Sequence, residues 1–360
     1  MQTVLTIIIV LAFGVVFERY FFCMNSAISD AFISRDTRKL KGLLTAVLVS
    51  AVLFNILIGL GALKASRWPL FSTAIAGGLI FGIGMVLAGG CVSGTLFKMG
   101  QGHVASFIAF SGIVLGLATI GLAMSMVTMA GSGAKPLVGA TLPNMLGVNP
   151  LFFAALSAAL CLWAFMAWKR KAGALNTTVS GIAGRQARLK SPNYLAGGLL
   201  IAVLNTALFA VQGYPLMMSG LMIYIPSRLA FMFDSAWAAK NPMFGGFLDP
   251  GHEYVMMALT GVFFIAGAFL SSLLSKRFRI RLPVLRQAIS SLIGGYLMGL
   301  AIPLMWGCNV THILGNVPQF SAASLVSAAG IVAGAWLGIK LITRLAAPLI
   351  QGTPEKAPGQ

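Results

Sequence analysis

The chain has 360 residues, of which 58% are hydrophobic and only 9% are charged. Soluble domains carry about 25% charged residues, so this composition excludes a soluble protein and indicates a membrane protein in contact with lipid. The formal net charge is +18, but the basic residues stand in short stretches beside apolar runs, as the positive-inside rule expects. We therefore expect no nucleic-acid partner.

Long apolar runs occupy most of the chain and predict an all-α polytopic membrane protein. A helical span needs about 20 apolar residues, and an open sheet cannot satisfy its backbone in lipid. The sequence contains about nine such runs. We expect transmembrane helices at about 3–22, 43–63, 69–89, 104–128, 150–168, 194–211, 254–274, 287–305 and 320–342.

Four short segments are too short or too polar to cross a bilayer. Each follows a break in an apolar run, and we expect it to form a half-helix. The breaks lie at Cys23, at Cys91, near Pro215 and at Cys308. Because a backbone break in a membrane lacks hydrogen bonds unless it lines a cavity or is buried in protein, these four places are candidates for a pathway.

The chain also contains a weak internal repeat. Cys91 and Cys308 each follow a glycine, and the same separation relates Gly82 to Gly299. The repeated spans run in opposite directions, which predicts an inverted repeat of four spans, one linker span and four spans. We expect a first repeat at 1–128, a linker span and basic loop at 129–193, a second repeat at 194–345 and a disordered tail at 346–360.

Basic stretches predict the orientation. The stretches 34–41, 169–190 and 276–286 are rich in lysine and arginine, and such loops remain on the cytoplasmic side. The N-terminus is then expected outside and the C-terminus in the cytoplasm.

Four cysteines and no CxxC pair argue against a disulfide framework and against a zinc site. We expect no metal, no cofactor and no catalytic residue. Cys161 lies in mid-span and is expected to be a small apolar packing residue. Cys23, Cys91 and Cys308 instead stand where half-helices begin, and the N-terminus of a helix attracts anions. Thiols there predict a midplane pathway for a small sulfur-containing anion.

Three motifs resemble the YeeE/YedE family of sulfur-transport membrane proteins. The first is an arginine–aromatic–cysteine end of the first span, within Glu18–Cys23. The second is Gly-Cys-x-x-Gly followed by a basic residue and Gly-x-Gly, within Gly90–Gly102. The third is Gly-Cys-Asn-x-x-His with a later Gly and Pro, within Gly307–Pro318. The first motif is longer than its usual form, and Lys98 stands where arginine is common.

This resemblance implies an hourglass-shaped protein of the bacterial inner membrane that takes up thiosulfate and passes it between thiols without covalent chemistry. A small soluble sulfur carrier of the cytosol is a further implied partner, which could dock on the basic inner loops. The residues that the resemblance and the breaks assign to the pathway are Cys23, Cys91, Cys308, Gly90, Gly94, Gly307, Asn309 and His312.

Other interpretations stay open at this point. A sister branch of the family is linked with selenium metabolism, so the substrate could be another sulfur or selenium compound. A membrane sulfurtransferase or thiol redox enzyme would need two thiols close enough to bridge, and a passive anion channel would differ only in kinetics. Two further expectations concern polar residues. Glu18 and Arg19 could form an ion pair within the membrane, and Asn205 and Gln212 could line the cavity.

Overall fold

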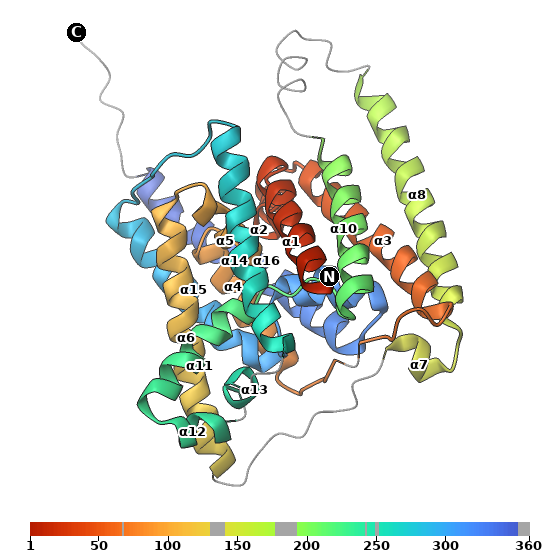
Figure 1. Cartoon of the computed structure of the whole chain (residues 1–360). Coiled ribbons are helices and arrows are strands. Elements are labelled where there is room, and N and C mark those ends of the chain that lie inside the picture. The colour runs from red at the N-terminus through yellow and green to blue at the C-terminus, as the bar shows by residue number, and fades with distance from the viewer. Residues whose placement is uncertain (67, 130–140, 177–192, 242, 249–251, 352–360) are drawn as a thin grey trace, which may run out of the picture.

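The computed structural model describes residues 1–66, 68–129, 141–176, 193–241, 243–248 and 252–351. Within these ranges the regular structure is helical, and nine segments are long and apolar enough to cross a membrane. The predicted multi-pass, all-α architecture is therefore confirmed (Figure 1). The helices that carry these segments are α1 (Gln2–Arg19), α3 (Arg38–Gly59), α4 (Ala74–Leu87), α6 (Val104–Met129), α8 (Pro150–Asn176), α10 (Tyr194–Gln212), α14 (His252–Leu274), α15 (Leu285–Met305) and α16 (Ala322–Gln351).

The predicted half-helices are present. Three are α2 (Met24–Ile33), α5 (Val92–Gly100) and α11 (Gly220–Phe233), and the fourth is a π-helix, η1 (Val310–Asn316), that continues into a 3₁₀ turn, η2 (Val317–Gln319). The chain leaves its helical path at Gly89 and Trp306, which both have positive φ angles (68° and 59°). Short helices α7 (Leu142–Leu146), α12 (Ser235–Lys240) and α13 (Gly245–Leu248) complete the fold.

Helix α11 begins further along the chain than the predicted break near Pro215. It begins at Gly220 and continues to Phe233, through Pro226. The hydroxyl of Ser227 donates to the carbonyl of Ile223 (2.7 Å). Proline is tolerated inside membrane helices, and α11 passes Pro226 without ending.

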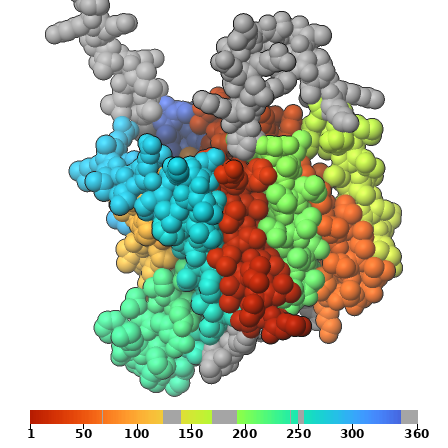
Figure 2. Space-filling model, turned by 45° about the horizontal axis from the view of Figure 1, so that its top comes forward, coloured from red at the N-terminus to blue at the C-terminus, as the bar shows by residue number. Residues whose placement is uncertain are grey.

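The helix packing has the pattern of a two-fold repeat. Helix α1 packs along α14, and its counterpart α10 packs along α3. Helix α15 packs along α6, and its counterpart α4 packs along α16, while α4 and α15 pack on each other. The surface view shows α1 between α14 and α10 (Figure 2). Exchanging each helix for its counterpart leaves these pairings unchanged, as the predicted repeat requires.

Glycines allow these helices to approach closely. Two glycines of each central helix (α4 or α15) face two glycines of a helix from the other repeat (α16 or α6, respectively), and a Cβ atom on any of them would collide with the facing backbone. Small residues permit such contacts between membrane helices. The facing pairs are Gly78 with Gly330, Gly82 with Gly334, Gly295 with Gly112 and Gly299 with Gly116.

The repeat is inverted. Gly77, near the start of α4, packs against Leu304 at the end of α15, and Gly84, further along α4, packs against Gly294 near the middle of α15. Residue numbers rise along one helix as they fall along the other, so the two equivalent helices run antiparallel. This is the geometry in which transporters place a site between their repeats.

The ends of two helices differ from the predicted bounds. Helix α8 packs along α3 and continues as helix to Asn176, beyond the predicted end of the span at 168. The rest of the basic loop, 177–192, lies outside the described residues. Helix α16 continues to Gln351, past the predicted start of the tail at 346, and residues 352–360 also lie outside the described part.

One prediction follows from the glycine contacts. Gly82→Val and Gly299→Val should each lower the free energy of unfolding by about 3 kcal/mol or more, because overpacking costs about 1–3 kcal/mol and here the facing group is backbone, which cannot move aside. Thermal unfolding in detergent measures this loss. Ala76→Val is the matched control, because Ala76 is exposed on the same helix. A loss in only one of the two glycine variants would contradict the equivalence of the repeats.

Candidate functional site at the broken helices

Two buried thiols meet where the first two half-helices begin. Cys23 precedes α2 and Cys91 precedes α5, both with extended backbone, and their sulfur atoms lie 3.5 Å apart. Both are free cysteines. The sequence placed them 68 positions apart, so their contact depends on the break at the end of α1 and the break at the end of α4 facing one another.

Cys91 also caps its half-helix. The backbone N–H of Gly94 donates to the Cys91 sulfur (3.4 Å), which additionally contacts the hydroxyl of Ser93 (3.4 Å). The first N–H groups of a helix have no partner within the helix, so the thiol satisfies one of them. The arrangement joins a polarizable sulfur atom to the positive end of α5.

Gly94 makes room for the thiol pair. A Cβ atom at this position would lie 2.5 Å from the sulfur of Cys23 and 3.4 Å from that of Cys91. At Gly90, by contrast, the nearest atom to a Cβ would be 3.6 Å away, an ordinary contact. The turn instead requires Gly89, whose φ is 68°. Of the predicted glycines, Gly94 therefore has a clear steric role, and Gly90 has none.

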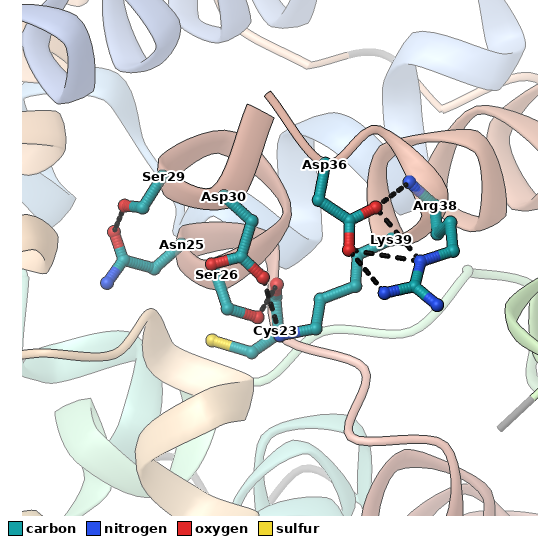
Figure 3. Close-up of polar contacts among 8 residues, drawn as sticks. All are labelled: Cys23, Asn25, Ser26, Ser29, Asp30, Asp36, Arg38 and Lys39. Carbon is teal, nitrogen blue, oxygen red and sulfur yellow. Dashed lines mark hydrogen bonds and ion pairs between the residues drawn. The ribbon is translucent and has the colours of Figure 1, made fainter. Parts of the chain in front are cut away.

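Charged groups anchor α2 at the end away from the thiols. Lys39 at the start of α3 pairs with Asp30 of α2 (2.7 Å), beside the exposed pair of Arg38 and Asp36 (2.7 Å). Hydrogen bonds from Arg38 lower the pKa of Asp36. The sulfur of Cys23 points away from the Asp36–Arg38 pair (Figure 3). The half-helix is thus held at its charged end while its thiol faces the protein interior.

The third thiol is connected to this pair through its neighbour. Asn309, which follows Cys308, donates from its amide nitrogen to the sulfur of Met24, which follows Cys23 (2.8 Å). Cys308 itself is fully buried and contacts the hydroxyl of Thr311 (3.4 Å). The break at Cys23 therefore contacts both the break at Cys91 and the break at Cys308.

Two polar atoms beside Cys308 have no hydrogen-bond partner among the described residues. They are the amide oxygen of Asn309 and Nε2 of His312, and both side chains are fully buried. Nδ1 of His312 lies 3.0 Å from the hydroxyl of Ser324, which fixes the ring. A Cβ on Gly307 would lie 3.2 Å from Nε2, so this glycine leaves the ring nitrogen space. Unpaired buried polar atoms cost about 1–3 kcal/mol each, which favours a role with a ligand.

A mostly apolar cavity of about 260 Å³ leads to the third break. Its lining includes Gly307, Trp306 and Trp68. Trp68 follows the end of α3, so this cavity opens on the face of the protein opposite to the start of that helix. Three methionines also line it: Met217, Met243 and Met257.

A second cavity, of about 480 Å³, lies on the other face and is strongly basic. Its lining includes Phe21, two residues before Cys23, and Phe97 of α5, the half-helix that begins after Cys91. The breaks thus have a cavity on either side, one apolar and one basic. The cationic residues that line the basic cavity are Lys98, Lys276, Arg277, Arg279 and Arg281.

The expected ion pair between Glu18 and Arg19 is wrong. Glu18 is fully buried and pairs with Arg277 of a distant loop (3.6 Å), and it also accepts hydrogen bonds from Gln101 (3.1 Å) and Ser271 (2.6 Å). Arg19 instead donates to Ser275 (2.8 Å). Adjacent residues on a helix point in different directions, so sequence neighbours were poor candidates for a pair.

Asn205 has a structural role. Its amide nitrogen donates to the carbonyl of Leu314 (2.8 Å), and its oxygen accepts from the N–H of Leu216 (2.9 Å). Both contacts satisfy broken backbone of the second repeat. Gln212 donates to the carbonyl of Tyr214 (3.0 Å). In the part of the chain that the structure describes, no group of three or more His, Cys, Asp or Glu side chains could hold a metal ion.

The chain is similar in sequence to known transporters. The chain is 27% identical over 343 residues to the thiosulfate transporter TsuA of Spirochaeta thermophila, covering 90% of this chain and 94% of that protein. It is 28% identical over 341 residues to the thiosulfate transporter TsuA of Escherichia coli, covering 91% of each. The probable transporter YedE of Escherichia coli is 35% identical over 104 residues, 29% of this chain and 26% of that protein.

The family model described as sulphur transport matches residues 19–337, which include all three cysteine-bearing breaks. This match confirms the resemblance drawn from the motifs. The family and these relatives are transporters, so the enzyme interpretation is set aside. The chain belongs to the sulphur transport family of multi-pass membrane proteins.

Proposed function

We propose that this protein takes up thiosulfate across the bacterial inner membrane, along a midplane pathway formed by the thiols of Cys23, Cys91 and Cys308. The names of the two relatives that align along about 90% of the chain support the substrate. The observation that carries the pathway is the contact between the sulfur atoms of Cys23 and Cys91 (3.5 Å) at the start of two half-helices.

The distribution of charge supports the proposed orientation in the membrane and the direction of transport. The basic cavity and the loop 276–281 lie on one face, and basic loops remain in the cytoplasm. We therefore place this face inside, with the N-terminus outside and the C-terminus in the cytoplasm. The anion enters the cavity lined by Trp68 and Trp306, passes the breaks and leaves through the basic cavity.

The chemistry of the pathway is non-covalent. Moving an isolated ion into a low-dielectric interior carries an idealised cost on the order of 20 kcal/mol. Backbone N–H groups at the starts of α2 and α5 offer donors in place of water, and Nε2 of His312 does so in the tautomer whose Nδ1 accepts from Ser324. Thiols add weak donors with polarizable sulfur. Weak contacts suit transport, because a site that binds too tightly does not release its ion.

We further propose that a small soluble sulfur carrier docks on the cytoplasmic face and accepts the imported anion. The exposed positive charge of the loop 276–281 supports this, because complementary charge steers association. If neutralising Lys276, Arg277, Arg279 and Arg281 together left the affinity for such a carrier unchanged, docking through this loop would be contradicted.

The main test is uptake of labelled thiosulfate by cells that lack their own importers. The intact protein should support uptake, and Cys91→Ala and Cys308→Ala should each reduce it at least tenfold at equal membrane expression, because each removes a thiol from the narrow part of the pathway. Cys161→Ala, on the peripheral helix α8, is the matched control and should leave uptake unchanged. Full uptake in both variants would contradict the pathway, and no uptake by the intact protein would contradict the substrate and favour another sulfur or selenium compound.

Two neighbouring glycines provide a sharper test of the thiol pair. Gly94→Ala should reduce thiosulfate uptake severalfold, because the added methyl group must displace the sulfur of Cys23. Gly90→Ala, four residues away on the same break, should retain uptake because its methyl group meets only ordinary contacts. Both substitutions are measured at equal expression in the same cells. Equal uptake by the two variants would show that the Cys23–Cys91 contact does not matter for transport.

A further inference from the structure

The basic cavity concentrates positive charge that protein carboxylates leave unneutralised. Among the described residues, Lys276, Arg279 and Arg281 form no ion pair, and the lining of the cavity contains no Asp or Glu. Lys98 adds its charge while donating to the carbonyl of Gly89 (2.7 Å). A concave surface lined by one sign of charge focuses the field and raises the local concentration of counter-ions.

The cavity wall is held in place by backbone hydrogen bonds. The N–H of Arg279 donates to the carbonyl of Gln101 (3.2 Å), and the N–H of Arg281 donates to that of Gly102 (3.0 Å). The carbonyl of Arg281 in turn accepts from Val104 (3.1 Å). Gly102 has a φ of 87°, and a Cβ there would lie 2.8 Å from the Arg279 carbonyl. The loop that carries the cations is therefore fastened to the turn between α5 and α6.

Arg277 stands between a buried carboxylate and the cavity. Its guanidinium lies 3.6 Å from Glu18, outside hydrogen-bond distance, and 5.1 Å from the ring of Phe21. Nη1 of Arg277 has no hydrogen-bond partner among the described residues. Because Glu18 is occupied by Gln101 and Ser271, Arg277 keeps donor capacity for another acceptor.

The pKa of His103 is consistent with a positive potential here. Burial lowers this pKa, and the charges of Arg281 and Lys98 lower it further, against the opposing effect of the Lys98 carbonyl. His103 lies between the membrane-spanning segments that end at Gly100 and begin at Val104. It lines the same cavity as the five cations.

We propose that this cavity is a second anion-binding site, which holds a small divalent oxyanion through Arg277, Arg279 and Arg281. Guanidinium groups match the oxygen atoms of such an anion and can bind it in a bidentate manner. The volume of about 480 Å³ far exceeds the roughly 30 Å³ occupied by a water molecule, so a hydrated anion fits. That the physiological ligand is thiosulfate leaving the thiols rests on the proposed function, but the anion site itself does not.

The test uses the full-length protein in phosphatidylcholine nanodiscs and labelled sulfate, which has the same charge as thiosulfate but no terminal sulfur for a thiol relay. Saturable sulfate binding is expected, and the double variant Arg279→Gln/Arg281→Gln should weaken it at least tenfold. These two side chains are exposed, so the variant should fold. Arg286→Gln is the matched control, because Arg286 is exposed at the start of α15 and does not line the cavity, and it should change the affinity less than twofold.

Two further variants make the test specific. Glu18→Gln should tighten sulfate binding because it removes the charge that competes for Arg277. Cys91→Ala should leave sulfate binding unchanged, since no thiol lines this cavity. The same titration in nanodiscs that contain phosphatidylglycerol separates a free anion from a lipid headgroup, and unchanged affinity supports the free anion.

Three results would overturn the proposal: no saturable sulfate binding, binding that survives the double arginine variant, or sulfate binding abolished by phosphatidylglycerol. None of them depends on thiosulfate uptake. If the intact protein bound sulfate as expected but took up no thiosulfate, the proposed function would fail and the anion site would stand. If uptake depended on Cys91 and Cys308 while sulfate did not bind, the anion site would fail and the proposed function would stand.

Discussion

The structure depends on one constraint, which is that the backbone of a broken helix must find hydrogen-bond partners inside the membrane. The two repeats meet this constraint in different ways. In the first repeat the thiol of Cys91 accepts from the N–H of Gly94. In the second, Asn205 of α10 pairs with Leu314 and Leu216, and Asn55 of α3 donates to the carbonyl of Pro318 (2.8 Å). The sulfur atom of Cys91 is thus a capping group as well as a candidate contact for an anion.

Close glycine packing makes this arrangement possible. Because α4 and α15 approach each other and their partners at backbone distance, the two repeats are packed tightly against one another. The result is a buried group of thiols with an apolar cavity on one side and a basic cavity on the other. In the proposed pathway, an anion that loses its water in the apolar cavity needs fixed donors at the breaks, and the cations beyond them favour its exit.

Periodicity and composition were sufficient for much of the fold. Apolar runs predicted the spans, and the glycines before Cys91 and Cys308 predicted the breaks and the repeat. The predicted positions differ from the structure at two of the breaks. A half-helix was expected directly after the break near Pro215, but α11 begins only at Gly220 and continues through Pro226. The sequence also made Gly90 a candidate, whereas Gly89 has the positive φ and Gly94 makes the close approach.

Long-range polar contacts could not be predicted from sequence. Glu18 and Arg277 are far apart in the chain and meet only because α1 packs on α14. The contact of Asn309 with Met24 likewise depends on how the two repeats face each other. Such contacts decide which charges are neutralised and which remain available, so the basic cavity emerges only from the folded structure.

The most direct measurement of the central claim is an experimental structure of the protein bound to thiosulfate. The account predicts density for the anion within hydrogen-bond distance of Cys91 or Cys308, with its terminal sulfur facing a thiol. Density that occupies only the basic cavity, with the three thiols packed against protein atoms alone, would contradict a pathway through the broken helices.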